Sequence, residues 1–182
     1  MVAARTVTIE EFGGMGSAGD NFELVDGVLQ DREIMGGRHG EFGSEIHGHL
    51  YVFNRTAALG RLYTSDTGFI VDAVTQSVLK PDVAFVLAGR LPPVEERIGF
   101  MPVVPDLVVE VVSPNDRFVE VAEKIERYQR VGVPLIWLVQ PSPRAVIVYA
   151  AGQEPQTIGE DGTLDGDEIL PGFCLPVREI FR

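Results

Sequence analysis

A glutamate stands in the middle of the most apolar strand-like segment of the sequence, Leu107-Val108-Val109-Glu110-Val111-Val112. β-Branched residues favour a strand. A segment that is apolar on both sides of its glutamate is typical of a central strand covered on both faces. An ionised carboxylate in such a place costs several kcal/mol unless it is paired, neutralised or bound to a metal ion. The segment therefore predicts a covered sheet and marks Glu110 as a candidate site residue.

The remaining pattern predicts strands mixed with two main helices, which is an α/β sandwich around one sheet. Gly36-Gly37 leads into a predicted helix, whose apolar residues from Phe42 to Ala57 recur at three- or four-residue spacing, and Gly60 follows it as a stop. A second helix is expected from about Asp116 to Val131, after a turn and helix caps at residues 113–116. Asp26-Gly27 predicts the turn of a hairpin over residues 20–30. Residues 88–105 are rich in proline and glycine and predict a loop, which could serve as a lid or a dimer contact. Further strands are expected at residues 62–63, 68–71, 83–87, 133–139 and 145–149, with small strands and a short helix to close the chain.

Length and composition indicate one domain, residues 1–182, with no membrane association. The 182 residues suit a single core. The longest apolar run, near residues 133–139, is interrupted by Pro134 and is too short to span a bilayer. The first residues lack the pattern of a secretion signal, and the single cysteine, Cys174, fits a reducing cytoplasm. We expect a cytoplasmic protein with Cys174 buried among apolar residues.

A second carboxylate, Asp82, begins another apolar strand after Lys80-Pro81. Two carboxylates on neighbouring strands can hold a hard cation such as Mg²⁺, which prefers oxygen ligands. Such a cation can polarise a phosphodiester and lower the pKa of a bound water. Equally, Glu110 could pair with a buried cation or be protonated, and Asp82 could cap a turn. The residues alone leave both interpretations open.

Lys124 borders the apolar stripe of the second helix, one turn from both Val121 and Tyr128. If the helix covers the end of the Glu110 strand, its ammonium group could position the attacking water or stabilise charge on a phosphate. The alternative is a solvated lysine paired with Glu120 or Glu123.

His39, at the start of the first helix, could contact a phosphate or carry a proton. A histidine at a helix end is more often a polar surface residue.

Several motifs together resemble the bacterial restriction endonuclease family of the Uma type. They are Phe22-Glu23-Leu24-Val25-Asp26-Gly27, Arg38-His39-Gly40, Lys80-Pro81-Asp82-Val83-Ala84-Phe85-Val86, Pro105 to Pro114, Lys124-Ile125-Glu126-Arg127-Tyr128, Gly132-Val133-Pro134-Leu135-Ile136-Trp137 and Leu170-Pro171-Gly172-Phe173. That family is similar to the PD-(D/E)XK nucleases. The resemblance implies a restriction-endonuclease-like mixed β-sheet flanked by helices.

The resemblance also implies roles for individual residues. Asp82 and Glu110 would bind Mg²⁺ or Mn²⁺, and Glu23 would be a further ligand or orient a metal-bound water. In the parent motif the lysine lies two residues after the acidic residue, a place that Val112 occupies here. The family pattern offers a lysine from the following helix instead, which matches Lys124.

The first functional hypothesis is therefore a metal-dependent endonuclease that hydrolyses DNA. A net charge of −12 argues against tight, non-specific DNA binding. It favours the alternative of a non-catalytic binding or assembly module with a weakened site. A third hypothesis is a hydrolase that acts on another phosphorylated substrate. Because enzymes that cut duplex DNA often pair two sites by two-fold symmetry, a homodimer is expected.

Overall fold

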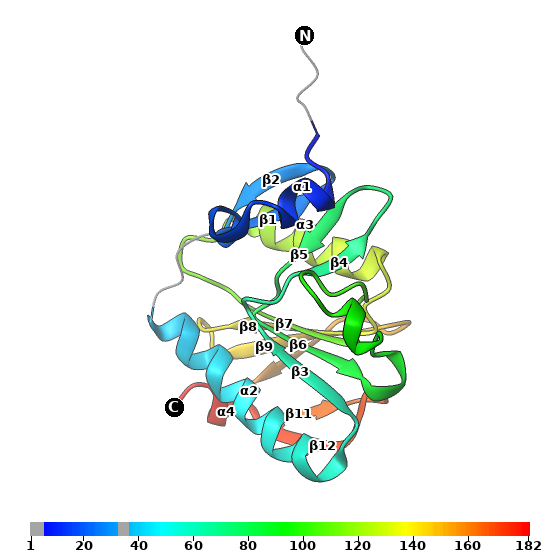
Figure 1. Cartoon of the computed structure of the whole chain (residues 1–182). Helices are drawn as coiled ribbons and strands as arrows, with labels where there is room; N and C mark the ends of the chain where they lie inside the picture. The colour runs from blue at the N-terminus through cyan, green and yellow to red at the C-terminus, as the bar shows by residue number, and fades with distance from the viewer. Residues whose placement is uncertain (1–5, 33–36) are drawn as a thin grey trace.

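A six-stranded mixed sheet forms the centre of the molecule (Figure 1). The computed structural model describes residues 6–32 and 37–182. The central sheet has the order β10-β9-β8-β7-β6-β3, in which β7 and β8 are parallel and the other neighbours antiparallel. Its strands are β3 (Gly60–Thr64), β6 (Val83–Leu87), β7 (Leu107–Val111), β8 (Leu135–Gln140), β9 (Ala145–Ala150) and β10 (Gln156–Gly159). The expected mixed sheet is thus confirmed, and every residue of β7 is buried.

The expectation of one sheet was wrong, because the strands form three sheets. A four-stranded sheet has the order β2-β1-β5-β4, and a two-stranded sheet pairs β11 with β12. Their strands are β1 (Phe22–Val25), β2 (Val28–Asp31), β4 (Phe69–Asp72), β5 (Ser77–Leu79), β11 (Thr163–Gly166) and β12 (Leu170–Pro176). The chain leaves β5 and enters β6 through Lys80-Pro81-Asp82. Because Pro81 has no N–H to donate, the ladder is interrupted there and the two strands join different sheets.

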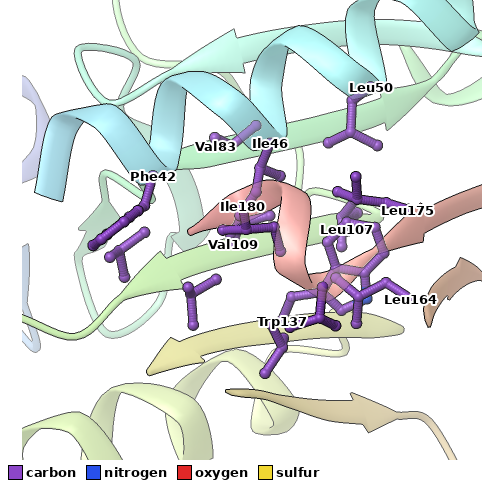
Figure 2. Close-up of a cluster of buried hydrophobic side chains, with 14 of the residues drawn as sticks. Phe42, Ile46, Leu50, Val83, Leu107, Val109, Trp137, Leu164, Leu175 and Ile180 are labelled. Atoms are coloured by element: carbon purple, nitrogen blue, oxygen red, sulfur yellow. The ribbon is translucent and has the colours of Figure 1, made fainter. Parts of the chain in front are cut away.

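Each face of the central sheet is covered by a different set of elements (Figure 1). Helices α2 (Gly37–Ala57) and α4 (Val177–Ile180) lie on one face with β11 and β12. Helix α3 (Phe118–Arg130) and the four-stranded sheet lie on the other. Figure 2 shows Phe42, Ile46 and Leu50 of α2 in the core cluster that contains Val109 and Trp137. The helix expected from Gly36-Gly37 is confirmed from Gly37 onward, and Gly36 lies outside the described residues.

The hairpin is confirmed, since β1 and β2 pair antiparallel around Asp26 and Gly27, both at positive φ. The second helix begins at Phe118, and its N-cap Arg117 makes no side-chain cap bond. The expected caps at residues 113–116 were therefore wrong. Asp116 Oδ2 instead accepts the Ser113 N–H at 2.7 Å, which closes a turn before the helix.

Cys174 is exposed, so its expected burial was wrong. Side chains alternate along β12, and this alternation directs its neighbours Phe173 and Leu175 into the core and Cys174 outward. Apolar neighbours in the sequence therefore did not make it part of the core. Among the described residues, no helix has both the length and the apolar character needed to cross a membrane.

Short helices complete the described chain. They are α1 (Ile9–Gly13), η1 (Gly16–Gly19), η2 (Ala88–Arg90) and η3 (Val94–Glu96). The last two lie in the segment 88–105 that was expected to be a loop. That segment is attached to the four-stranded sheet through Met101, whose backbone N–H and C=O bond to Gly68 and Ile70.

Truncation of Ile46, which is fully buried under the central sheet, should destabilise the fold strongly. Ile46→Ala removes buried methyl groups and leaves a cavity, so we expect a loss of about 2–5 kcal/mol in urea-induced unfolding. Val52→Ala on the exposed side of the same helix is the control, because Val52 is 71% exposed. Equal losses for both variants would contradict the observed orientation of α2.

Candidate active site

The candidate site lies where β6 and β7 separate. The last register pair between them is Val83 with Val109, whereas β7 continues beside β8 to Val111. On the β6 side, the backbone of Val111 therefore has no strand partner among residues 6–32 and 37–182. Its N–H donates to Asp82 Oδ2 at 2.8 Å, and its carbonyl accepts from His39 Nε2 at 2.7 Å. Two side chains thus replace the missing strand and fix the Asp82 carboxylate.

His39 and Asp82 also form a buried ion pair, with Nε2 and Oδ2 3.2 Å apart. Burial opposes the charge on each group. The Asp82 carboxylate nevertheless outweighs burial and raises the pKa of His39, with help from the Val111 carbonyl and Glu110. Likewise, His39, Lys124 and the Val111 N–H outweigh burial and lower the pKa of Asp82. His39 is therefore an interior residue of the site and not the surface histidine of the alternative interpretation.

On the α3 side of the sheet, Glu110 contacts two residues of that helix. Its Oε1 accepts from Tyr128 Oη at 2.6 Å and lies 2.9 Å from Lys124 Nζ. Lys124 and Tyr128 are four residues apart, so both project from the same side of the helix. Lys124 is therefore held by the interior glutamate instead of the helix-surface glutamates that the sequence also allowed.

Glu23 of β1 brings a second carboxylate to Lys124. Its Oε1 lies 3.3 Å from Lys124 Nζ and accepts the backbone N–H of Lys80 at 2.6 Å. The Lys80 ammonium group donates to the carbonyls of Gly19 and Asp20 at 3.1 and 3.0 Å, just before β1. Lys80 and Lys124 are the only lysines of the sequence, against 13 arginines. Lys124 binds the carboxylates, and Lys80 anchors the start of the strand that supplies Glu23.

The close carboxylates change one another's protonation. Burial raises the pKa of Glu110 to about 7; Lys124 opposes this rise, and the charges of Asp82 and Glu23 add to it. Burial opposes the charge on Lys124, but Glu110, Glu23 and Asp82 together raise its pKa. Burial and Glu110 raise the pKa of Tyr128 well above its ordinary value. Its hydroxyl therefore stays protonated and donates a hydrogen bond to Glu110. The site thus combines acidic oxygens with one ammonium group whose pKa is raised by them.

The donor set fits a small divalent cation. Asp82, Glu110 and Glu23 each use one oxygen for the contacts above, and within the described residues the other oxygen has no hydrogen-bond partner. Among those residues, no group of three or more His, Cys, Asp or Glu forms a ready metal cage. Mg²⁺ does not require one, because it is usually held by one or two carboxylates together with waters and substrate phosphate.

Two cavities open beside these residues. A cavity of about 690 Å³ between α3 and the β1–β2 hairpin is lined by Glu23, Glu110 and Lys124. A smaller one of about 270 Å³, beside α2, is lined by His39 and Asp82. The two carboxylates expected to form a pair therefore border different cavities, one on each side of the place where β6 and β7 separate.

Tyr128 and Lys80 are contacts of the site that sequence reasoning missed. Tyr128 was assigned only to the apolar face of its helix. A buried tyrosine hydroxyl nearly always requires a partner, and Lys124 one turn away indicates where that partner lies. Lys80 was noted only as part of a motif. No local signal points to its bonds with Gly19 and Asp20, because they depend on tertiary contacts.

Replacement of Asp82 by asparagine should lower the pKa of His39. Asp82→Asn removes the negative charge that raises this pKa, while the burial that lowers it remains. Titration of the histidine ring protons by NMR checks this, with the His39 signal identified from its absence in His39→Gln. An unchanged His39 titration in folded Asp82→Asn protein would contradict the observed ion pair.

Comparison with known proteins agrees with this geometry. The family model Uma2, described as "Putative restriction endonuclease", matches residues 9–178. A solved structure described as a "putative nuclease belonging to DUF820" from Anabaena variabilis ATCC 29413 superposes with a TM-score of 0.80 at 20% sequence identity. The superposition covers 96% of this chain and 97% of that chain, so the two proteins share one fold. The curated proteins contain no match. From residue 9 to residue 178, the chain belongs to the Uma2 family of restriction-endonuclease-like proteins.

Proposed function

We propose that this protein is a divalent-metal-dependent endonuclease that hydrolyses phosphodiester bonds of DNA. The observation that supports this most directly is the contact of Glu110 and Glu23 with Lys124, whose charge also acts on Asp82. Each of the three carboxylates is anchored through one oxygen, and among the described residues its other oxygen has no hydrogen-bond partner. The family and the nuclease fold point to the same class of reaction.

Asp82 and Glu110 are the proposed ligands of Mg²⁺ or Mn²⁺, and Glu23 is a further ligand or orients water. When bound, the cation would polarise the scissile phosphodiester and make a water more acidic. Tyr128 holds the Glu110 carboxylate in place through a 2.6 Å hydrogen bond. His39 and the Val111 N–H hold Asp82 in the same way. These contacts support a positioning role for His39 more than a contact with phosphate.

Lys124 is the proposed catalytic cation. It lies 2.9 Å from Glu110 Oε1, so it borders the place where the phosphate would meet the carboxylates. Because its pKa is raised above the ordinary value, it is charged at neutral pH. A fixed positive charge there would stabilise the negative charge that develops on the phosphate.

The net charge of −12 makes the cation essential for substrate binding as well. Three carboxylates would repel a phosphate unless a metal ion neutralised them. The same charge favours the alternative of a non-catalytic module that keeps the fold and binds no metal. The pairing of two copies to cut both strands stays a prediction.

Asp82→Asn and Glu110→Gln should each reduce Mg²⁺- or Mn²⁺-dependent cleavage of DNA by about two orders of magnitude or more, because each removes a metal-binding oxygen charge. Lys124→Met should lower kcat by about 10²–10³-fold, as expected for the loss of a group that stabilises developing charge. The measurement is the nicking rate of a supercoiled plasmid by purified, folded protein. Glu126→Gln is the matched control, since Glu126 is exposed on the same helix and is not among the described residues that line the cavity. Activity that survives the loss of both carboxylates would rule out this site.

Mn²⁺ should raise the thermal stability of the protein independently of any cleavage. A ligand that binds only the folded state stabilises it by mass action, so a concentration about 100 times the dissociation constant should raise Tm by roughly 5 °C or more. Glu110→Gln should abolish this shift, whereas Glu126→Gln should retain it. A wild-type protein whose Tm does not respond to millimolar Mn²⁺ would favour the non-catalytic module.

A further inference from the structure

The wall of the larger cavity contains a second α3 cation, Arg127, three residues after Lys124. A guanidinium group has five N–H donors. In the described part of the protein, Arg127 makes one polar contact, from Nη2 to Asp26 Oδ2 at 3.4 Å, which is long for a hydrogen bond. Its Nε is buried and has no acceptor there. Among the described residues its guanidinium group therefore has Asp26 as its one protein partner, although its side chain is only 16% exposed.

The other arginine of this cavity behaves differently. Arg32 donates to the carbonyls of Ser65 and Lys80 at 3.1 and 3.3 Å, so its guanidinium group has a structural role. A buried donor without an acceptor destabilises a fold, and an acceptor supplied by a bound molecule or ion is one reason for its retention. Phosphate is the anion whose geometry a guanidinium group matches best, because two parallel N–H groups can bind two oxygens.

We propose that Arg127 binds a non-scissile phosphate of the substrate strand, next to the phosphate at Lys124. This inference rests on the proposed function. Residues three apart lie on the same face of a helix, so Lys124 and Arg127 form a row of two positive charges along the cavity. Lys124 is already paired with Glu110 and Glu23, whereas the one polar partner of Arg127 in the described part of the chain is Asp26, at a long distance. A phosphate would replace Asp26 as its partner.

The other charged residues of the cavity lining indicate why Arg127 in particular would bind a phosphate. Its lining also contains Asp31, Asp116, Glu120 and Glu123, which repel a polyanion. Of the three cations in the lining, Arg32 is bound to carbonyls and Lys124 to carboxylates. Arg127 is therefore the cation whose loss should weaken binding of nucleic acid most.

The test compares Arg127→Gln with Arg130→Gln in the full chain. Both remove one positive charge from α3, but Arg130 is exposed and does not line the cavity. Binding of a fluorescein-labelled DNA oligonucleotide is followed by anisotropy with Mg²⁺ at several salt concentrations. We expect Arg127→Gln to lose about tenfold or more in affinity and about 0.7–0.9 in the slope of log K against log salt, and Arg130→Gln to change little. In plasmid cleavage, Arg127→Gln should raise KM and leave kcat nearly unchanged. Equal effects of the two variants on affinity and salt slope would overturn the proposal.

Asp26→Asn provides an independent test that leaves Arg127 intact. It weakens the internal competitor for the guanidinium group, so affinity for the oligonucleotide should rise; an unchanged or lower affinity would count against the proposal, even if Arg127→Gln fails to fold. Measuring DNA binding apart from DNA cleavage also distinguishes this inference from the proposed function. Wild-type protein that binds DNA through Arg127 but never cuts it would refute only the hydrolysis, whereas the absence of any DNA binding would refute the phosphate contact.

Discussion

The separation of β6 from β7 is the constraint on which the rest of the site depends. β7 extends beyond its last pairing with β6, and on that side the backbone of Val111 is left without a strand partner among the described residues. A buried backbone group must find a hydrogen bond, so Asp82 and His39 fill the gap. The same separation opens space on both sides of the sheet, where the two cavities lie. Polar side chains thus reach the apolar core at the place where the pairing of β6 with β7 ends.

Lys124 balances the charges that this arrangement concentrates. Glu110 is buried within β7, and its pKa near 7 reflects the cost of keeping it ionised there. The ammonium group of Lys124 opposes that cost by contacting both Glu110 and Glu23. Removal of one member of such a group leaves an uncompensated buried charge. Structural integrity and proposed chemistry therefore depend on the same contacts.

Much of the fold could be predicted from local pattern. The buried strand around Glu110, the amphipathic α2 and α3, and the Asp26-Gly27 hairpin were all correct, because each depends on periodicity or turn chemistry within a short segment. The number of sheets and the exposure of Cys174 were predicted wrongly, because distant segments decide which strands pair and which side of a strand faces the core. The resemblance to a family supplied Lys124, and the structure placed its side chain against Glu110.

The sequence by itself determined that a carboxylate is buried in a central strand, since no apolar segment keeps a glutamate without a compensating contact. Only the tertiary structure decided which contacts compensate it. Tyr128 and Lys124 of α3 contact Glu110, while Glu23 of β1 and His39 of α2 reach neighbouring positions through packing against the two faces of the sheet. The distances between these side chains depend on how α2, α3 and the β1–β2 hairpin pack against the central sheet. That arrangement arises from the burial of whole faces, which no single motif encodes.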